Sequence, residues 1–227
     1  MRTPTLVLEL RSTYALNAGS ATLVLEYGGA MAWDVEGTKR RIQEAALAEF
    51  SQFGATGTTI DRIAKRAAVN RERVYKYYGD KAALFSKVVR YELDKLAEDV
   101  PLRQVAGPDD LADFAGLSFD YLKEHPDVAR LVLWEGLADA GAVQDEAERT
   151  GLYVGKARAV AEAQRAGLID SSIAPAHLVF LLIALAVQWW ATPQMARMLA
   201  TGQDDDSPAR RREAVVQAAR RLTAVGS

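Results

Sequence analysis

The stretch from Thr58 to Lys81, TTIDRIAKRAAVNRERVYKYYGDK, holds side chains whose types and spacing suit contact with DNA. Arg71 and Arg73 lie in the first turn of a predicted helix, from which a guanidinium group can donate two hydrogen bonds to O6 and N7 of guanine. Thr58 and Thr59 stand at the start of another predicted helix, where hydroxyl and backbone N–H groups suit a phosphate oxygen. The chemistry indicated is hydrogen bonding to base edges and to the DNA backbone.

The same stretch supplies further phenol and ammonium groups near the expected path of the DNA backbone. In an arbitrary protein, exposed arginines such as Arg71 and Arg73 are more often solvated charges on a helix face. Tyr75 is equally well explained as a partly packed side chain or as a phosphate contact. Asn70 is first a helix cap and second a DNA ligand. The candidate DNA-binding residues are Thr58, Thr59, Asn70, Arg71, Arg73, Tyr75, Lys76, Tyr77 and Lys81.

Two short helices are expected to position these residues. Thr59 is a good N-cap for the first, and Asn70 for a second that runs to about Tyr77. A tight turn near residues 67–69 separates them. This is the plan of a helix-turn-helix over about residues 59–78, in which the first helix crosses the DNA backbone and the second enters the major groove. The first helix has apolar residues at helical spacing, namely Ile60, Ile63, Ala64 and Ala67.

Over residues 37–96 the sequence resembles the TetR (tetracycline-repressor-like) family of bacterial transcriptional regulators. In that family the positions of Tyr75 and Lys81 contact phosphates, and the second helix contacts bases. The sequence departs from the family by having Ala68 where the turn usually holds glycine, and by a long leader before the first helix. The residues that carry the resemblance are Phe50, Gly54, Thr58, Thr59, Ile60, Ile63, Ala64, Ala67, Val69, Tyr75, Tyr78, Lys81 and Leu84.

Charge is distributed unevenly along the 227 residues, whose formal net charge is −2. Residues 37–81 carry ten basic and five acidic side chains, and residues 82–227 carry sixteen and twenty-one. A basic segment joined to a larger acidic body suggests a nucleic-acid-binding module on a regulatory body. The chain has no cysteine, which excludes disulfides and thiolate metal sites.

The expected fold is all-α, with helical periodicity from Glu36 onward. We expect residues 1–35 to be an N-terminal extension, 36–96 a helix-turn-helix DNA-binding domain, and 97–227 a helical bundle for dimerisation and effector binding. Two repeated runs within residues 5–26 could form a weak hairpin; alternatively, translation starts at Met31. No segment resembles a membrane span or export signal, since the most apolar run covers only about 14 residues, so we expect a cytoplasmic protein.

The C-terminal part offers an aromatic-rich candidate pocket and two candidate dimerisation helices. The resemblance implies that helices near 175–191 and 208–225 pair in a homodimer. It also implies a pocket for a small apolar or aromatic effector. Plain core packing is the commoner role for each aromatic taken alone. No cofactor and no metal are expected, because the acidic run at 204–206 fits a solvated loop. The candidate pocket residues are Phe114, Phe119, Trp134, Tyr153, Phe180 and Gln188.

The function expected from these features is that of a ligand-responsive repressor, acting as a homodimer on a near-palindromic operator. The alternative is an α-helical small-molecule-binding protein or enzyme without specific DNA binding. The sequence has no nucleophile elbow, Gly-rich phosphate loop or paired histidines at ligand spacing, which argues against the enzyme. A helical interaction protein without DNA binding would leave Arg71, Arg73 and Lys81 without a role.

Overall fold

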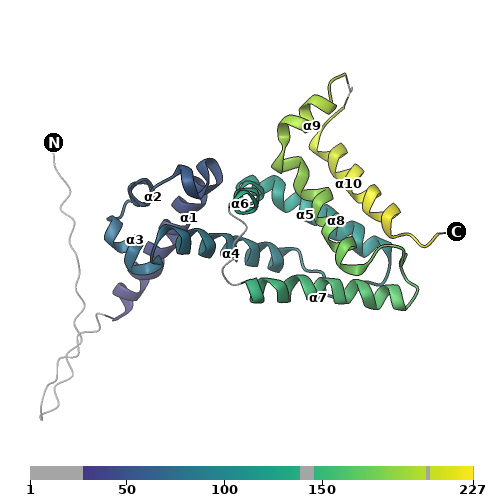
Figure 1. The fold of residues 1–227 in the computed structure, drawn as a ribbon, viewed down its shortest axis with the longest axis horizontal. Coiled ribbons are helices and arrows are strands. Elements are labelled where there is room, and N and C mark those ends of the chain that lie inside the picture. The colour runs from purple at the N-terminus through teal and green to yellow at the C-terminus, as the bar shows by residue number, and fades with distance from the viewer. Residues whose placement is uncertain (1–27, 139–145, 203–204, 227) are drawn as a thin grey trace, which may run out of the picture.

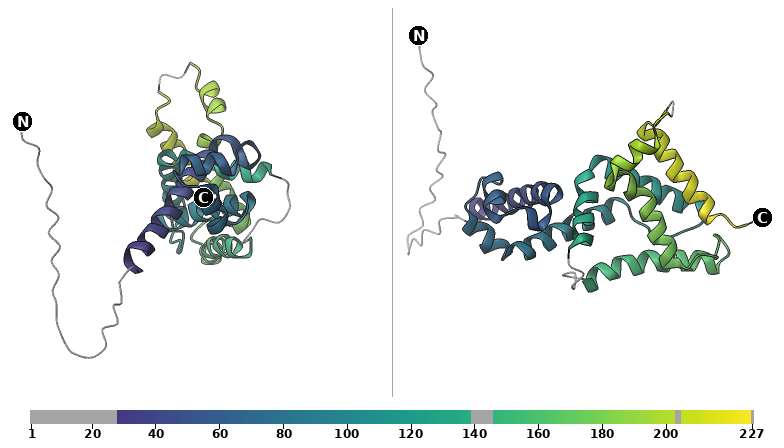
Figure 2. Two further views of the ribbon diagram at one scale, coloured as in Figure 1. Left: turned by 90° about the vertical axis from the view of Figure 1, so that its left-hand side faces the viewer. Right: turned by 45° about the horizontal axis from the view of Figure 1, so that its top comes forward.

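The computed structural model of the chain describes residues 28–138, 146–202 and 205–226. These ranges contain α-helices and no β-strand (Figure 1), which confirms the predicted all-α class. The runs within residues 5–26 that suggested a hairpin lie outside the described residues. The helices form two groups, with the helices of residues 28–78 at one end and a bundle at the other (Figure 2).

The first group consists of three helices. They are α1 (Gly28–Gly57), α2 (Ile60–Arg66) and α3 (Arg71–Tyr78). The first begins before the predicted start near Glu36 and has a break at Gly54, whose φ is 68°. The side chains of Thr59 and Asn70 accept hydrogen bonds from the backbone N–H of Arg62 and Arg73, as predicted for N-caps.

Helix α4 (Lys81–Asp99), capped by Asp80, runs from the first group of helices into the bundle (Figure 1). Its first half packs into the N-terminal core with Leu84, Phe85, Val88 and Val89, where the rings of Phe50 and Phe85 meet edge to face at 5.0 Å. Its later residue Leu96 packs against the C-terminal core. One helix thus joins the two groups.

In the described ranges the bundle is built from six helices, five of which begin at a proline that suits the first helical turn. Helices α8 and α9 also meet at a proline, Pro193, where the chain bends by 86°. In the described ranges, no single helix has the length and apolar character needed to cross a membrane. The helices are α5 (Pro108–Glu124), α6 (Pro126–Leu137), α7 (Glu146–Arg165), α8 (Pro175–Ala191), α9 (Pro193–Leu199) and α10 (Pro208–Thr223).

Helix α10, which the sequence predicts to take part in dimerisation, packs lengthwise on α5. Val215 and Ala219 are buried within the protomer. At Gly116 of α5, an added Cβ would lie 2.9 Å from a Val216 methyl carbon, so the two helices approach closely. Val215 and Ala219 fill the protomer's own core, and the pairing of this helix with a partner chain stays a prediction.

Helix α6 connects the bundle to α1 through Trp134. Its indole N–H donates a hydrogen bond of 3.1 Å to the carbonyl oxygen of Ser51. Gly54 lies directly against the indole: a Cβ there would be 2.7 Å from Trp134 Cε3. Leu131, one turn earlier, is fully buried in the N-terminal core. The glycine break in α1 thus leaves room for the tryptophan.

We predict that Gly54→Ala destabilises the chain by about 2 to 4 kcal/mol, because alanine combines a strained positive φ with a clash against Trp134. The midpoint and slope of urea unfolding, followed by tryptophan fluorescence at fixed protein concentration, measure this change. Gly136→Ala on α6 is the matched control, because nothing lies within 4 Å of its added Cβ. Equal stability of the two variants would contradict the packing described here.

Candidate nucleic-acid interface

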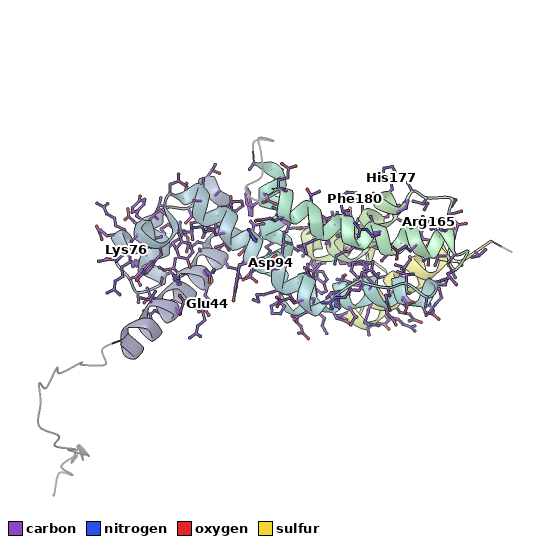
Figure 3. All side chains as sticks on the ribbon, turned by 90° about the horizontal axis from the view of Figure 1, so that it is seen from below. Glu44, Lys76, Asp94, Arg165, His177 and Phe180 are labelled. Atoms are coloured by element: carbon purple, nitrogen blue, oxygen red, sulfur yellow. The ribbon has the colours of Figure 1, made fainter. Side chains whose placement is uncertain are left out.

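Helix α3 presents a strongly polar face to solvent. Arg71, Arg73, Tyr75 and Lys76 are exposed, and Lys76 points outward at the end of the molecule opposite Arg165 (Figure 3). The opposite face anchors the helix through buried Val74 and Tyr78. The phenol of Tyr78 donates a hydrogen bond of 3.0 Å to the carbonyl oxygen of Lys39. The arrangement offers cations and a phenol on one helix that is held from behind.

The two arginines of α3 differ in their surroundings. Arg71 lies 3.9 Å from an oxygen of Asp61 and 3.3 Å from one of Glu72, both exposed acids. Arg73 forms no ion pair within the described part of the chain. Exposed pairs contribute little, so Arg71 can exchange its partners for DNA. Arg73 has no acidic partner to give up among the described residues, so its guanidinium group is the more available of the two.

Thr58 does not lie where the sequence suggested. Its side chain is 1% exposed, and its hydroxyl donates a hydrogen bond of 2.9 Å to Glu49. The half-buried Lys81 donates from Nζ to the Thr58 carbonyl oxygen at 3.1 Å, so it supports the start of α2. Thr59 is exposed beside them, and Tyr77 is half-buried. The assignment of the Thr58 hydroxyl to a phosphate is wrong, since a buried donor with a partner cannot reach DNA.

A buried carboxylate, Glu49 of α1, was missed by the sequence reasoning. Its two oxygens accept hydrogen bonds of 2.9 Å from Thr58 Oγ1, Arg62 Nε and Arg66 Nη1. Burial raises the pKa of this carboxyl, but these three hydrogen bonds outweigh burial and hold the pKa below its ordinary value of 4.5. The signal was present in the sequence: an acid beside Phe50 on a predicted apolar face. Glu49 fastens α2 to α1 and so positions the helix-turn-helix.

The turn between α2 and α3 contains Ala68, the residue that stands where the family usually has glycine. Ala68 has φ of 54°, in the left-handed region that favours glycine. The alanine there costs about 1 to 2 kcal/mol. The turn nevertheless keeps the helix-turn-helix geometry, with the Val69 N–H donating to the Ala64 carbonyl oxygen at 3.0 Å.

A partly enclosed cavity of about 110 Å³ lies in the bundle beside α6. Phe114 and Tyr153 line it, as predicted. The other candidates lie elsewhere. Phe119 packs on Trp190 in the core, Trp134 contacts α1, and Phe180 and Gln188 are exposed on α8. These four side chains do not line this cavity, because the rotation of each helix directs them elsewhere, and Gln188 lines a separate groove beside α9. Most of the wall is aliphatic, including Leu93, Leu96, Leu122, Val132, Ile183 and Val187.

Helix α6 links this cavity to the DNA-binding helices. Val128, Ala129 and Val132 line the cavity, whereas Leu131 and Trp134 pack in the N-terminal core. At the end of α6, Glu135 forms a bidentate ion pair with Arg149 of α7, whose Nη1 and Nη2 donate to the two carboxylate oxygens at 2.7 and 2.9 Å. Arg149 also lines the cavity. Helix α6 therefore contributes both to the wall of the cavity and to the N-terminal core.

The described residues contain no cluster of three or more metal-binding side chains. Of the acidic run near residue 205, Asp205 and Asp206 pair with Arg210 and Arg211.

Comparison with known proteins matches two parts of the chain to one family. Residues 42–88 match "Bacterial regulatory proteins, tetR family", and residues 110–221 match "Tetracyclin repressor-like, C-terminal domain". The HTH-type transcriptional repressor SCO4008 of Streptomyces coelicolor is 40% identical over 190 residues, which cover 83% of this chain and 96% of that protein. The chain belongs to the TetR family.

Two further TetR-family proteins show the extent of the likeness. The regulator RutR of Escherichia coli is 31% identical over 164 residues, covering 70% of this chain and 74% of RutR. The crystal structure of SCO4942 from Streptomyces coelicolor, described as a transcriptional regulator, is 35% identical with a TM-score of 0.71, covering 82% of this chain and 98% of that one. By this membership the chain is a DNA-binding transcriptional repressor rather than an enzyme, as its sequence predicts.

For this TetR-family chain we predict that Glu49→Gln lowers stability at neutral pH by about 1 to 3 kcal/mol, since an amide loses the charge that three donors favour. A carboxyl with a lowered folded-state pKa stabilises the fold above its ordinary value of 4.5, and this contribution is lost as pH falls through the folded-state pKa. The difference between the two proteins should therefore narrow below about pH 4.5.

Urea unfolding at a series of pH values measures this dependence. Glu44→Gln is the matched control, because Glu44 is exposed on the same helix and pairs only at 3.8 Å with Arg40. If Glu49→Gln followed the control at every pH, the carboxylate would have no structural role.

Proposed function

We propose that this TetR-family repressor binds a near-palindromic DNA operator as a homodimer and releases it when a small apolar or aromatic effector enters the cavity beside α6. The observation that carries the proposal is that α6 belongs both to the wall of the cavity and to the core of the DNA-binding helices. Val128 and Ala129 line the cavity, while Leu131 is buried among the DNA-binding helices. An effector that binds the protein more tightly in one position of α6 shifts the protein toward that position. The change in DNA affinity is set by the effector's difference in affinity for the two positions. We further propose that the protein acts in the cytoplasm, where its operator lies.

In this proposal α3 enters the major groove, where Arg71 and Arg73 contact base edges. The exposure of both arginines supports these roles, as does the excess of basic residues in this segment. Asn70 keeps its capping role at the start of the helix. Lys81, bound to the Thr58 carbonyl oxygen, contributes its charge from behind the first row of contacts. The residues proposed to contact the DNA backbone are Thr59, Tyr75, Lys76 and Tyr77.

We predict that Arg73→Ala weakens operator binding by about 1 to 3 kcal/mol and relaxes base preference at one position of each half-site. The operator is first selected from random duplex DNA at physiological salt, and affinities are then measured by fluorescence anisotropy. Lys76→Ala is the comparison: it should weaken binding to all duplexes alike and make affinity less dependent on salt. Unchanged sequence preference in a folded Arg73→Ala protein would count against α3 as the base-contacting helix.

The homodimer is supported by an apolar surface on α8 that the protomer leaves uncovered. Leu178 and Leu182 are buried in the bundle, whereas Phe180 is 71% exposed on the opposite side of the same helix. The neighbouring α9 adds Met195 and Leu199, and α10 adds Leu222, to a groove beside this surface. Pairing through α8 and these neighbours would bury apolar area and set two α3 helices about 34–36 Å apart, as adjacent half-sites require.

We predict that Phe180→Glu converts the dimer to a monomer and lowers operator affinity more than tenfold, since a single helix-turn-helix engages only one half-site. Light scattering coupled to size exclusion gives the mass, and anisotropy gives the affinity. Leu137→Glu is the control, because Leu137 is 75% exposed at the end of α6. A Phe180→Glu protein that stayed dimeric would move the interface away from α8.

A further inference from the structure

The cavity beside α6 has four polar side chains in an otherwise apolar wall: Ser118, Arg149, Tyr153 and Lys156. Three of them are engaged. The Ser118 hydroxyl donates to the Phe114 carbonyl oxygen at 2.7 Å. Arg149 is held by both oxygens of Glu135, and Tyr153 lies beside it. Only Lys156 is left with its charge unmatched.

Lys156 projects from α7 over the ring of Phe114, with Nζ 5.5 Å from the ring centroid. Phe114 is buried, so the ammonium lies at the cavity wall. No carboxylate in the described part of the chain forms an ion pair with it. Burial lowers the pKa of Lys156, which means that the charged form is poorly compensated in the protein alone. An anion in the cavity would supply the missing partner.

The outer side of Lys156 does not supply that anion. Lys156, Ala97 and Leu152 also line a wider groove that continues from the cavity to solvent. This groove contains Arg103 and Arg158 as well as Asp94 and Glu98, so its charges are balanced. The single unbalanced charge at the junction is the ammonium of Lys156.

We propose that the effector of this chain is a compact apolar monocarboxylate, whose hydrocarbon part fills the cavity and whose carboxylate pairs with Lys156. The inference rests on the effector response proposed above and adds the chemical class of the ligand. The cavity of about 110 Å³ limits the apolar part to at most about the size of a benzene ring, since benzene is accepted by an apolar cavity of about 150 Å³. The carboxylate gains a charge-assisted hydrogen bond in a poorly solvated position.

The test uses two pairs of probes that differ in charge and hardly in shape: benzoate with benzamide, and 3-methylbutanoate with 3-methylbutanamide. Calorimetry on the full chain gives the dissociation constants, and anisotropy gives release of the selected operator. At least one acid should bind about tenfold or more tightly than its amide and should release the operator. Equal binding of acid and amide, or no binding of either pair, overturns the proposed ligand class.

The variant Lys156→Met keeps the apolar stem and removes the charge. It should weaken binding of the acid about tenfold or more and leave binding of the amide within about twofold. Lys156→Arg should retain the preference for the acid. Arg165→Met removes an exposed cation from the same helix and should leave the affinities for the acid and for the amide unchanged. If Lys156→Met bound the acid as tightly as the unmodified chain, the proposed pairing would be wrong.

Operator binding without ligand separates this proposal from the function on which it rests. Intact, sequence-specific binding by Lys156→Met keeps the repressor assignment whatever the probes do. Loss of specific binding by the unmodified chain would instead contradict the proposed DNA interface, with no bearing on the cavity.

Discussion

The packing of α6 into two hydrophobic cores is the constraint on which the rest of the structure depends. Leu131 and Trp134 belong to the core of the DNA-binding helices, and Val128 and Ala129 belong to that of the bundle. Because closely packed side chains cannot move independently, α6 cannot shift in one core without disturbing the other. Gly54 makes this possible, since any side chain there would meet the indole of Trp134. The same contact is the physical route for the effector response that we propose.

Polar groups in the DNA-binding part divide into those that build it and those that remain available to a partner. The buried Glu49 takes up Thr58, Arg62 and Arg66 in hydrogen bonds. Such a carboxylate is stable when buried because its donors replace the water it has lost. The exposed cations of α3 have weak partners or none among the described residues. The sequence records only a basic segment, whereas the structure separates internal support from external surface.

The bundle shows a similar division of apolar side chains. Helix α8 is apolar nearly all round: Leu178 and Leu182 fill the protomer core, while Phe180 faces solvent. On α10, Val215 and Ala219 are buried in the protomer, whereas Leu222 lines the groove beside α8, so apolar periodicity alone did not distinguish an internal surface from an external one. In the cavity, by contrast, apolar walls isolate the charge of Lys156. Apolar side chains thus contribute to the core, to the proposed interface or to the proposed ligand site, depending on which way they point from their helix.

The sequence by itself determined the local features of this protein: the all-α class, the caps at Thr59, Asn70 and Asp80, and the strained Ala68. These depend on hydrogen bonds and dihedral angles within a few residues. Only the tertiary structure decided that Thr58 faces Glu49, that Trp134 meets Ser51, and which aromatic side chains line the cavity. Successive side chains on a helix are rotated by about 100° about its axis, so neighbouring residues face different parts of the molecule. Which part each one meets depends on packing partners distant in the sequence, which no local pattern specifies.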